Sequence, residues 1–198
     1  MNIHPTNLIG KVVRLEPLSE IHIPGLCKIG FDPSIWRWML YGEINTEEKM
    51  RQFVVDLLDR QLKGNDLPFA VIYRPNNEVA GCTRFMEIRR EDRGLEIGGT
   101  WYGLKYQRSV VNTECKYLLL RHAFEVYGCI RVQFKTDLRN LRSQKAIKRI
   151  GAVQEGILRN HIIRPDGIIR HTVFYSILDN EWPEVKIKLE NLLSIVNH

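Results

Sequence analysis

The chain has 198 residues, 44% of them hydrophobic, so it can bury one domain-sized core and is neither a disordered tail nor a disulfide-stapled miniprotein. Lys and Arg outnumber Asp and Glu by 29 to 23, and the net charge of +6 favours anionic partners such as phosphorylated cofactors, nucleic acid or acidic peptides. No apolar run approaches the roughly 18 to 20 residues that span a bilayer, and no apolar segment follows a basic start at the N-terminus. We therefore expect a cytoplasmic protein with neither a membrane span nor a signal peptide.

The four cysteines lie far apart in the sequence and form no C-x-x-C pair, which argues against a zinc knuckle or a thioredoxin-like site. They are Cys27, Cys82, Cys115 and Cys129. We expect them to be small buried hydrophobic residues in a reducing compartment.

The first half of the chain predicts a strand, a helix and then a meander of three strands. Residues 11–16 alternate apolar and polar residues as a strand does, whereas residues 32–41 are irregular and rich in aromatic side chains. Residues 45–63 carry an apolar stripe of helical period, and Thr46 can cap this helix. Further strands are expected at residues 68–73, 78–88 and 95–101, with a turn at residues 74–77.

The second half alternates helices with strands. Residues 115–126 predict a helix, which Asn112 or Thr113 caps and Gly128 terminates. The remaining elements are a strand at residues 130–135, a short basic helix at 140–150, hairpin arms at 153–163 and 168–177, and a last helix from Pro183 to about residue 196.

This order of elements predicts an α/β (α+β) domain. Runs of antiparallel strands with a strand–helix–strand crossover favour a mixed, mostly antiparallel sheet of about six to seven strands flanked by helices. No boundary divides the chain, so we expect one domain over residues 1–198, with the last helix free to pack on the core or to mediate a homodimer.

The stretch from Leu95 to Glu125 is the most informative part of the sequence for function. A predicted strand leads through a short loop, at residues 107–113, into the start of a helix. Unpaired N–H groups and the helix dipole at such a start can hold an anion, especially a diphosphate. By itself this pattern is equally compatible with an ordinary loop and helix cap.

Several motifs in this order resemble the GNAT superfamily of acetyl-coenzyme A-dependent N-acetyltransferases, in the branch related to the ribosomal-protein N-terminal acetyltransferases. They are LEIGGTWY before the loop, the Q-x-x-V-x-N loop, the NTECKYLLLRHAFE helix, and N-x-x-S followed by Gly151. GAVQEGILRNHII and YSILDNEW complete a resemblance that runs from Val12 to about Val185. It implies a GNAT-like sheet, acetyl-coenzyme A as the cofactor, and a primary amine as the acceptor, in a protein N-terminus or a small molecule.

Two positions depart from the family pattern. The family's loop reads Gln/Arg-x-x-Gly-x-Gly/Ala, but Val110 and Asn112 stand where it has its glycine positions. Glycine allows close approach of backbone to phosphate, so valine should weaken cofactor binding without abolishing it, and Arg108 can supply charge. Many relatives have a tyrosine acid seven residues after the asparagine, where this chain has Ile147.

The resemblance also implies roles for three residues. Ser143 occupies the position of the acid in the ribosomal-protein branch, and Asn140 lies one helical turn before it. The amine must lose a proton as it attacks the thioester, and our candidate base is Glu96. The alternatives are that Ser143 and Asn140 serve the helix start and that Glu96 is a solvent-facing strand residue. N–H groups of residues 99–102 are the expected donors to the oxyanion.

The residues expected to bind the cofactor lie around the loop and on the basic helix. They are Trp101, Tyr102, Gln107, Arg108, Ser109, Val110, Val111, Asn112, Thr113, Asn140, Ser143, Lys145 and Arg149. The acceptor is expected to meet Trp36, Tyr41, Arg84 and Tyr175, and core packing is the alternative for the three aromatic residues. Trp38 falls in the same acceptor-side segment.

Other features leave alternatives open. His161 and His171 lie on opposite arms of the last hairpin, but no third ligand is evident, so we expect no metal site. The basic helix can be a solvated face, a contact to the ribose phosphate or an RNA-binding face, and the last of these lacks interleaved aromatic residues. An acetyltransferase is therefore the leading interpretation, and a weakly active or inactive coenzyme A-binding or partner-binding module is the alternative.

Overall fold

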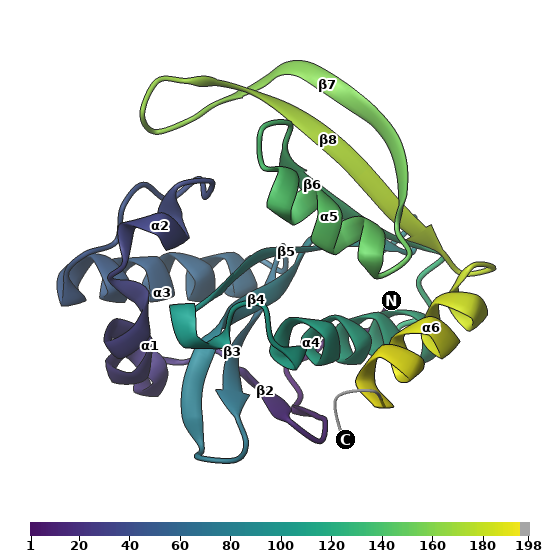
Figure 1. Cartoon of the computed structure of the whole chain (residues 1–198), viewed down its shortest axis with the longest axis horizontal. Coiled ribbons are helices and arrows are strands. Elements are labelled where there is room, and N and C mark those ends of the chain that lie inside the picture. The colour runs from purple at the N-terminus through teal and green to yellow at the C-terminus, as the bar shows by residue number, and fades with distance from the viewer. Residues whose placement is uncertain (195–198) are drawn as a thin grey trace.

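A computed structural model of the protein describes residues 1–194, and its strands form one mixed sheet (Figure 1). The strands are β1 (Leu8–Ile9), β2 (Val13–Pro17), β3 (Leu67–Tyr73), β4 (Glu78–Arg89), β5 (Gly94–Tyr102), β6 (Arg131–Asp137), β7 (Val153–Ile163) and β8 (Ile169–Leu178). Their order is β1-β2-β3-β4-β5-β6-β8-β7, and within the described residues the single parallel pair is β5 with β6. The mostly antiparallel mixed sheet is confirmed. It has eight strands because the two residues of β1 are too few to show an alternating pattern.

Helices fill the connections between these strands. They are α1 (Ile23–Gly30), α2 (Pro33–Trp36), α3 (Glu47–Leu62), α4 (Val110–Arg121), α5 (Leu141–Arg149) and α6 (Trp182–Ser194), with 3₁₀ turns at Glu20–His22 and Leu104–Tyr106 and a π-helical turn at His122–Val126. The predicted end of the last helix near residue 196 lies outside the described residues.

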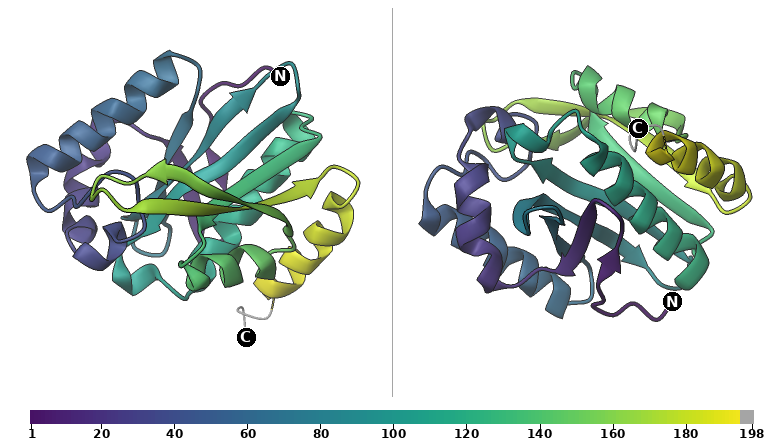
Figure 2. Two further views of the ribbon diagram at one scale, coloured as in Figure 1. Left: turned by 90° about the horizontal axis from the view of Figure 1, so that it is seen from above. Right: turned by 60° about the horizontal axis from the view of Figure 1, so that its bottom comes forward.

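Two hydrophobic clusters lie on opposite faces of the sheet, and Figure 2 shows the helices that cover these two faces. One cluster joins α4 and α6 to the sheet, and the other joins α1 and α3 to it. The hairpin of β7 and β8 continues the sheet beyond β6, and its turn arches towards α2 (Figure 1). The sheet thus separates a side covered by α4 and α6 from a side covered by α1 and α3.

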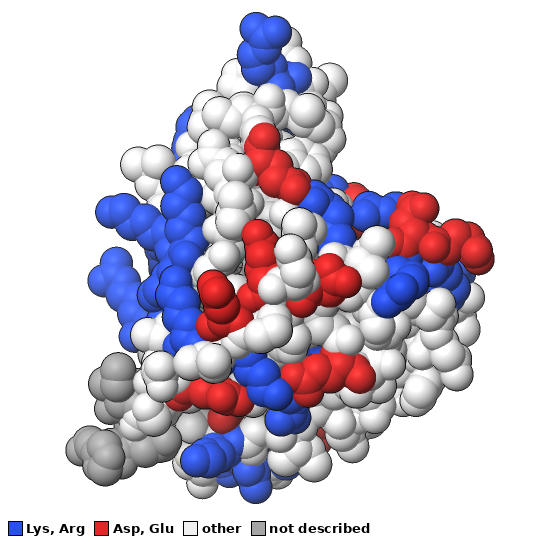
Figure 3. Space-filling view, turned by 90° about the vertical axis from the view of Figure 1, so that its right-hand side faces the viewer, with Lys and Arg blue, Asp and Glu red and all other residues white. Residues whose placement is uncertain are grey.

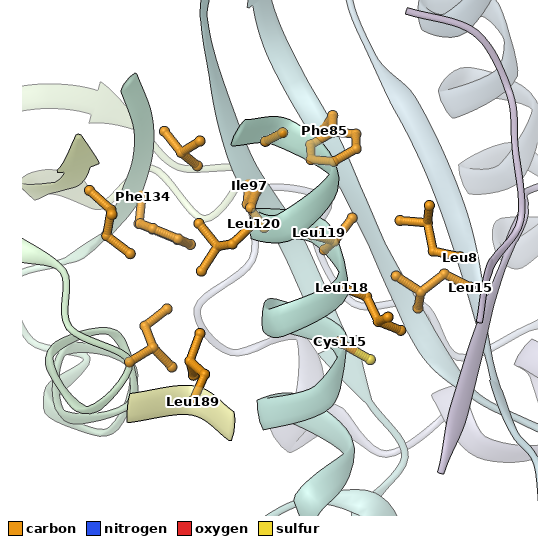
Figure 4. Packing of buried hydrophobic residues seen from close by; sticks show 14 of the residues in the cluster. Leu8, Leu15, Phe85, Ile97, Cys115, Leu118, Leu119, Leu120, Phe134 and Leu189 are labelled. Carbon is orange, nitrogen blue, oxygen red and sulfur yellow. The ribbon is translucent and has the colours of Figure 1, made fainter. Parts of the chain in front are cut away.

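Helix α4 is buried on most of its circumference. Figure 4 shows Leu120 turned towards Phe134 and Ile97, whereas Leu119 and Leu118 lie on the side of Leu15. Both Leu119 and Leu120 are fully buried. Burial of a leucine side chain contributes about 1.5–3 kcal/mol, so α4 is held firmly in place against the sheet.

The structure differs from the sequence prediction at two helices, α4 and α1. Helix α4 begins five residues earlier than expected, and Ser109 caps it instead of Asn112 or Thr113: the Ser109 hydroxyl accepts the N–H of Val111 at 3.3 Å. The consecutive valines after Ser109 have low helix propensity and concealed the start. Helix α1 was missed because its glycines disfavour a helix, yet Gly25 is needed where α1 approaches Val79 of β4 too closely for a Cβ.

Two further predictions agree with the structure. Thr46 caps α3, since its hydroxyl accepts the N–H of Lys49 at 3.3 Å. Cys82, Cys115 and Cys129 are buried and Cys27 is half-buried, and all four are free thiols. Burial raises the pKa of Cys82 and of Cys115 to about 12, which makes these thiols unreactive. Among residues 1–194, none of the helices combines the length and the apolar character that crossing a bilayer requires.

Candidate active site

Strands β5 and β6 separate part-way along their length. Within residues 1–194 their ladder holds three pairs and ends at Glu96 opposite Gln133, although β5 runs on to Tyr102 and β6 to Asp137. We call the region beyond that pair the β5–β6 separation. There β6 remains paired with β8, and β5 remains paired with β4. The facing edge of β5 therefore offers extended backbone N–H and C=O groups to a polar chain, as an open sheet edge does.

A bulge in β5 lies at this separation. The register between β4 and β5 shifts from Cys82 opposite Trp101 to Arg84 opposite Gly98. Gly99 lies in the bulge with a φ of +57°, a left-handed conformation that favours glycine. A bulge leaves backbone groups outside the ladder, so this segment can present the N–H donors that residues 99–102 were expected to supply.

The N-terminus of α4 opens beside the end of β5. Arg108 precedes it, exposed and with a φ of +58°, while Val110 is helical and half-buried. The backbone φ of Val110 is not positive, so valine fits this position without strain. The first helical turn leaves N–H groups without carbonyl partners, and Ser109 satisfies that of Val111 alone.

Side chains hold the loop before α4 in place. Gln107 donates to the carbonyl of Tyr102 at 2.9 Å, and Ser109 donates to the carbonyl of Tyr106 at 2.6 Å. The buried Tyr102 points its hydroxyl at Oδ1 of Asn112, 3.3 Å away. These predicted cofactor-binding residues are thus brought together at one end of α4, and Val111 is buried beneath them.

Helix α5 adds positive charge to the same place. Arg142 donates to Oε1 of Gln107 at 2.8 Å, and Arg149 donates to the hydroxyl of the buried Thr113 at 2.9 Å. Lys145 on the same helix is exposed. On the side of the molecule drawn in Figure 3, Lys and Arg form a continuous strip along the left edge, and over the rest of this side they are interspersed with Asp and Glu. The N-terminus of α4 therefore combines free N–H groups with nearby guanidinium groups, and such hydrogen-bond donors suit a diphosphate.

Asn140 and Ser143 form the start of α5. Asn140 is the N-cap, and its Oδ1 accepts the N–H of Ser143 at 3.1 Å. This is the capping role, and it leaves the Ser143 hydroxyl outside that bond. Ile147 is buried in the core, so the tyrosine position of the relatives offers no acid in this chain.

Glu96 lies on the face of the sheet away from α4. Its neighbours Leu95 and Ile97 belong to the core beneath α4, whereas Glu96 is 4% exposed and forms an ion pair with Lys135 at 2.9 Å. It also accepts from Gln133 at 3.2 Å, and Lys135 donates to Glu87 at 2.6 Å. Burial raises the pKa of Glu96, while the charge of Lys135 opposes that rise. The alternative of a solvent-facing strand residue is wrong, because this carboxylate is inside the molecule.

The predicted acceptor residues on this side lie in an aromatic cluster. Trp36 packs 5.0 Å from Trp101 and 5.9 Å from Phe53 between ring centroids, and Tyr41 lies 5.0 Å from Phe53. Trp36 donates to the carbonyl of Gly30 at 2.6 Å. Core packing is therefore the role that the structure shows for Trp36. Trp101, predicted on the cofactor side, is buried in this cluster on the other face.

Arg84 and Asp66 form a buried pair next to the bulge. They are 3% and 5% exposed, with Nε of Arg84 3.2 Å from Oδ2 of Asp66, and the guanidinium carbon lies 5.6 Å from the ring centre of Tyr41. Burial raises the pKa of Asp66 and that of Tyr41. A Cβ added to Gly99 would lie 3.1 Å from the Arg84 guanidinium carbon, so Arg84 does reach the edge of the β5–β6 separation.

Tyr175 and the two histidines have other surroundings. Tyr175 is fully buried in the core, where its hydroxyl donates to Gln144 at 3.2 Å, so as it lies it offers no surface to a substrate. His161 shares a hydrogen bond with Thr172 at 3.0 Å, and Nδ1 of His171 accepts the N–H of Asn160 at 2.9 Å. No group of three metal-binding side chains occurs within the described part of the chain.

Sequence reasoning missed Lys116, which lies buried in α4 near the separation. Its Nζ donates to the hydroxyl of Thr100 at 2.8 Å. The signal was present, because Lys116 shares a helix face with Leu120 and Ala123, both fully buried. A lysine on an apolar face is a buried charge with a specific partner.

Comparison with known proteins agrees with this geometry. Residues 13–153 match the model of the acetyltransferase (GNAT) domain. The chain belongs to the GNAT acetyltransferase family. A structure from T. thermophilus, assigned as an acetyltransferase, shares 41% identity with it, covers 98% of this chain and 100% of its own, and superposes with a TM-score of 0.89. The comparison with curated protein sequences finds no match.

More distant GNAT structures share the fold. A GCN5-related N-acetyltransferase from Brucella melitensis is 28% identical over 96% of this chain and 86% of its own, with a TM-score of 0.88. RimL, described as a ribosomal L7/L12 alpha-N-protein acetyltransferase, is 18% identical over 88% of this chain and 94% of its own, with a TM-score of 0.76. At that identity the likeness to RimL concerns the fold alone. The resemblance to the GNAT superfamily inferred from the sequence is thereby confirmed.

Proposed function

We propose that this GNAT protein transfers an acetyl group from acetyl-coenzyme A to a primary amine by direct attack in a ternary complex. The observation that carries the proposal is the β5–β6 separation, which has a buried carboxylate on one face and the N-termini of two helices on the other. Acetyl-coenzyme A supplies an activated acyl group on sulfur. The acceptor supplies the amine, and the groups that bind, orient and transfer protons come from the chain.

Residues of the α4 side fit the cofactor. N–H groups in the first turn of α4 and the guanidinium of Arg108 suit its diphosphate, and the free edge of β5 suits its amide-containing arm. Ser143, at the start of α5, has a hydroxyl free of the capping bond that can donate to the sulfur. Lys145 and Arg149 lie on the same helix, where they can meet the ribose phosphate.

Residues of the opposite face fit the acceptor. The neutral form of the amine attacks, and Glu96, buried on this face, takes the proton that the nitrogen loses as the amide forms, either directly or through water. Its raised pKa makes it a stronger base than an ordinary carboxylate. N–H groups in the bulge around Gly99 are suited to receive the negative charge that develops on the attacked carbonyl oxygen.

The acceptor class is a primary amine at a protein N-terminus or in a small molecule. The fold likeness to RimL and to a structure from Vibrio cholerae described as a ribosomal-protein-serine acetyltransferase supports the protein N-terminus. The α-amine of a protein has a pKa of about 8 and a lysine side chain one of about 10.4. An N-terminal amine therefore has the larger neutral fraction at neutral pH.

Calorimetry and thiol release test the proposal together. We expect acetyl-coenzyme A to bind, and we expect free thiol to be released with some members of a panel of peptide N-termini and small amines. Absence of binding at millimolar cofactor would remove the enzyme hypothesis. Binding without turnover would favour the second candidate, an inactive coenzyme A-binding module, for which the buried Ile147 at the relatives' tyrosine position is the supporting observation.

A further inference from the structure

Lys116 is a charged side chain beneath the β5–β6 separation. It is 7% exposed, and its Nζ donates to Oγ1 of Thr100 at 2.8 Å, which in turn shares a hydrogen bond with Oγ1 of Thr83 at 2.8 Å. The same Nζ lies 5.8 Å from the ring centre of Phe134. Thr100 is on β5 and Phe134 is on β6, and both lie beyond the last pair of the ladder. The ammonium therefore bridges the two strands where they have parted.

Lys116 and Glu96 serve opposite faces of the sheet. Phe134 belongs to the core that α4 covers, whereas Glu96 and its partner Lys135 project from the other face. The amine attacks from that face in its neutral form and loses a proton to Glu96, and the sulfur departs towards α4 and α5. Glu96 thus lies on the side of the attacking amine, and Lys116 lies on the side of the departing sulfur.

We propose that the Lys116 ammonium gives a proton to the departing sulfur, an inference that rests on the function proposed above. An alcohol hydroxyl such as that of Ser143 is a far weaker acid than a thiol and can donate a hydrogen bond without surrendering its proton. An ammonium has three N–H donors, and the bond to Thr100 occupies one of them.

The acidity of this ammonium matches the task. Burial lowers the pKa of Lys116 to about 8, although the nearby Cys115 and Glu96 oppose the effect. A thiol has a pKa of about 8.5, so proton transfer between the two groups is close to balanced, as efficient acid catalysis requires. The group is also largely protonated at neutral pH, which an acid must be.

The step balances in atoms and charge. The amine nitrogen forms a bond to the acyl carbon, the carbon–sulfur bond breaks, and the sulfur keeps the electron pair. Lys116 transfers one proton to that sulfur and becomes neutral, while Glu96 takes the one proton that the neutral amine loses as the amide forms. Glu96 then releases its proton to solvent and Lys116 regains one from solvent, which restores both groups.

The ionisation of bound coenzyme A tests this role without relying on turnover. Thiolate absorbs in the ultraviolet, so the thiol pKa of coenzyme A bound to the enzyme can be titrated. An ammonium within a few ångströms should lower that pKa by at least about one unit in the native protein. Lys116→Met should abolish the shift and reduce turnover, and it should fold, because methionine removes a buried charge and packs against apolar neighbours.

Two further variants make the test decisive. Lys63→Met, which removes an exposed lysine of the segment after α3, should leave both the thiol pKa and turnover unchanged. Lys116→Arg keeps the charge but cannot give up its proton, so it should lower the thiol pKa without restoring turnover. Equal thiol pKa values in the native protein and Lys116→Met, or full turnover in Lys116→Arg, would overturn the inference while leaving acetyl transfer intact. Failure of coenzyme A to bind would overturn both the role of Lys116 and the proposed acetyl transfer.

Discussion

On the α4 side of the sheet the candidate residues come from one continuous stretch and one neighbouring helix, whereas on the opposite face they come from separate elements. Residues 107–113 form the end of the connection from β5 and the first turn of α4, and Arg142 of α5 contacts Gln107 there. The opposite face draws Glu87 from β4, Glu96 from β5, Lys135 from β6 and Tyr41 from the segment after α2. The residues of the α4 side are close together in the sequence, whereas those of the opposite face are brought together only by the folding of the sheet.

The two sides also differ in how their polar groups are used. The α4 side offers backbone N–H groups that any residue can supply, so a single side-chain change alters binding modestly. The opposite face carries a buried ion pair between Glu96 and Lys135, each with further hydrogen bonds. Removing one member of such a set has a large effect, because its partners lose a specific charge. The predictions below use this contrast.

The largest expected effect is that of Glu96→Gln. It keeps the shape of the side chain and removes the base, so turnover should fall by about 100-fold or more, while acetyl-coenzyme A affinity should stay within about twofold. Steady-state rates with the best amine and calorimetry give the two numbers. Weaker cofactor binding in step with the loss of turnover would mean that Glu96 shapes the α4 side instead of serving the acceptor.

The pH dependence sharpens this assignment. Glu96 must be ionised to act as a base, and its pKa is raised by burial. The acid limb of the rate profile should therefore lie at higher pH than for an ordinary carboxylate, with the rate lost as the pH falls through that limb. In Glu96→Gln the limb should disappear. A limb that persists in the variant would belong to another group.

A smaller effect is expected for Ser143→Ala on the other side. A hydrogen bond to a charged group contributes about 1.5–3 kcal/mol, so loss of the hydroxyl should slow turnover by about 10-fold or more. The α5 cap should survive, because it depends on the Ser143 N–H and the Asn140 side chain. Ser194→Ala, at the end of α6, is the matched control and should be silent. Unchanged turnover in Ser143→Ala would leave the capping role as the whole role of this segment.

The same contrast explains what the sequence could predict. Strands β2 to β8, the Thr46 cap and the gathering of residues 107–113 at one helix start follow from local patterns, and all are present. The depth at which Glu96 is buried could not be predicted, because it depends on Gln133 and Lys135 of the parallel neighbour. No periodicity within β5 specifies which strand will lie beside it.

Packing also overrode local preference in particular places. Helix α1 forms despite its glycines, because Ile23 and Leu26 are buried and Gly25 allows contact with β4. Tyr175 was assigned to the acceptor on resemblance, yet its ring is fully buried among core residues. Lys116 was overlooked because a lysine is normally placed on the exposed face of a helix.

The smallest expected effect, Val110→Gly, has opposite signs for binding and stability. Glycine removes the side chain at the first position of α4 and lets backbone approach the diphosphate, so acetyl-coenzyme A should bind several-fold more tightly. Glycine also costs a helix up to about 1 kcal/mol, so the free energy of unfolding should fall by that amount or less. Calorimetry and chemical denaturation measure the two changes independently. Weaker or unchanged binding would mean that the valine at this position does not limit access to the N–H groups. Cofactor binding on the α4 side would then not depend on the side chain at this position, as expected where backbone N–H groups hold the ligand.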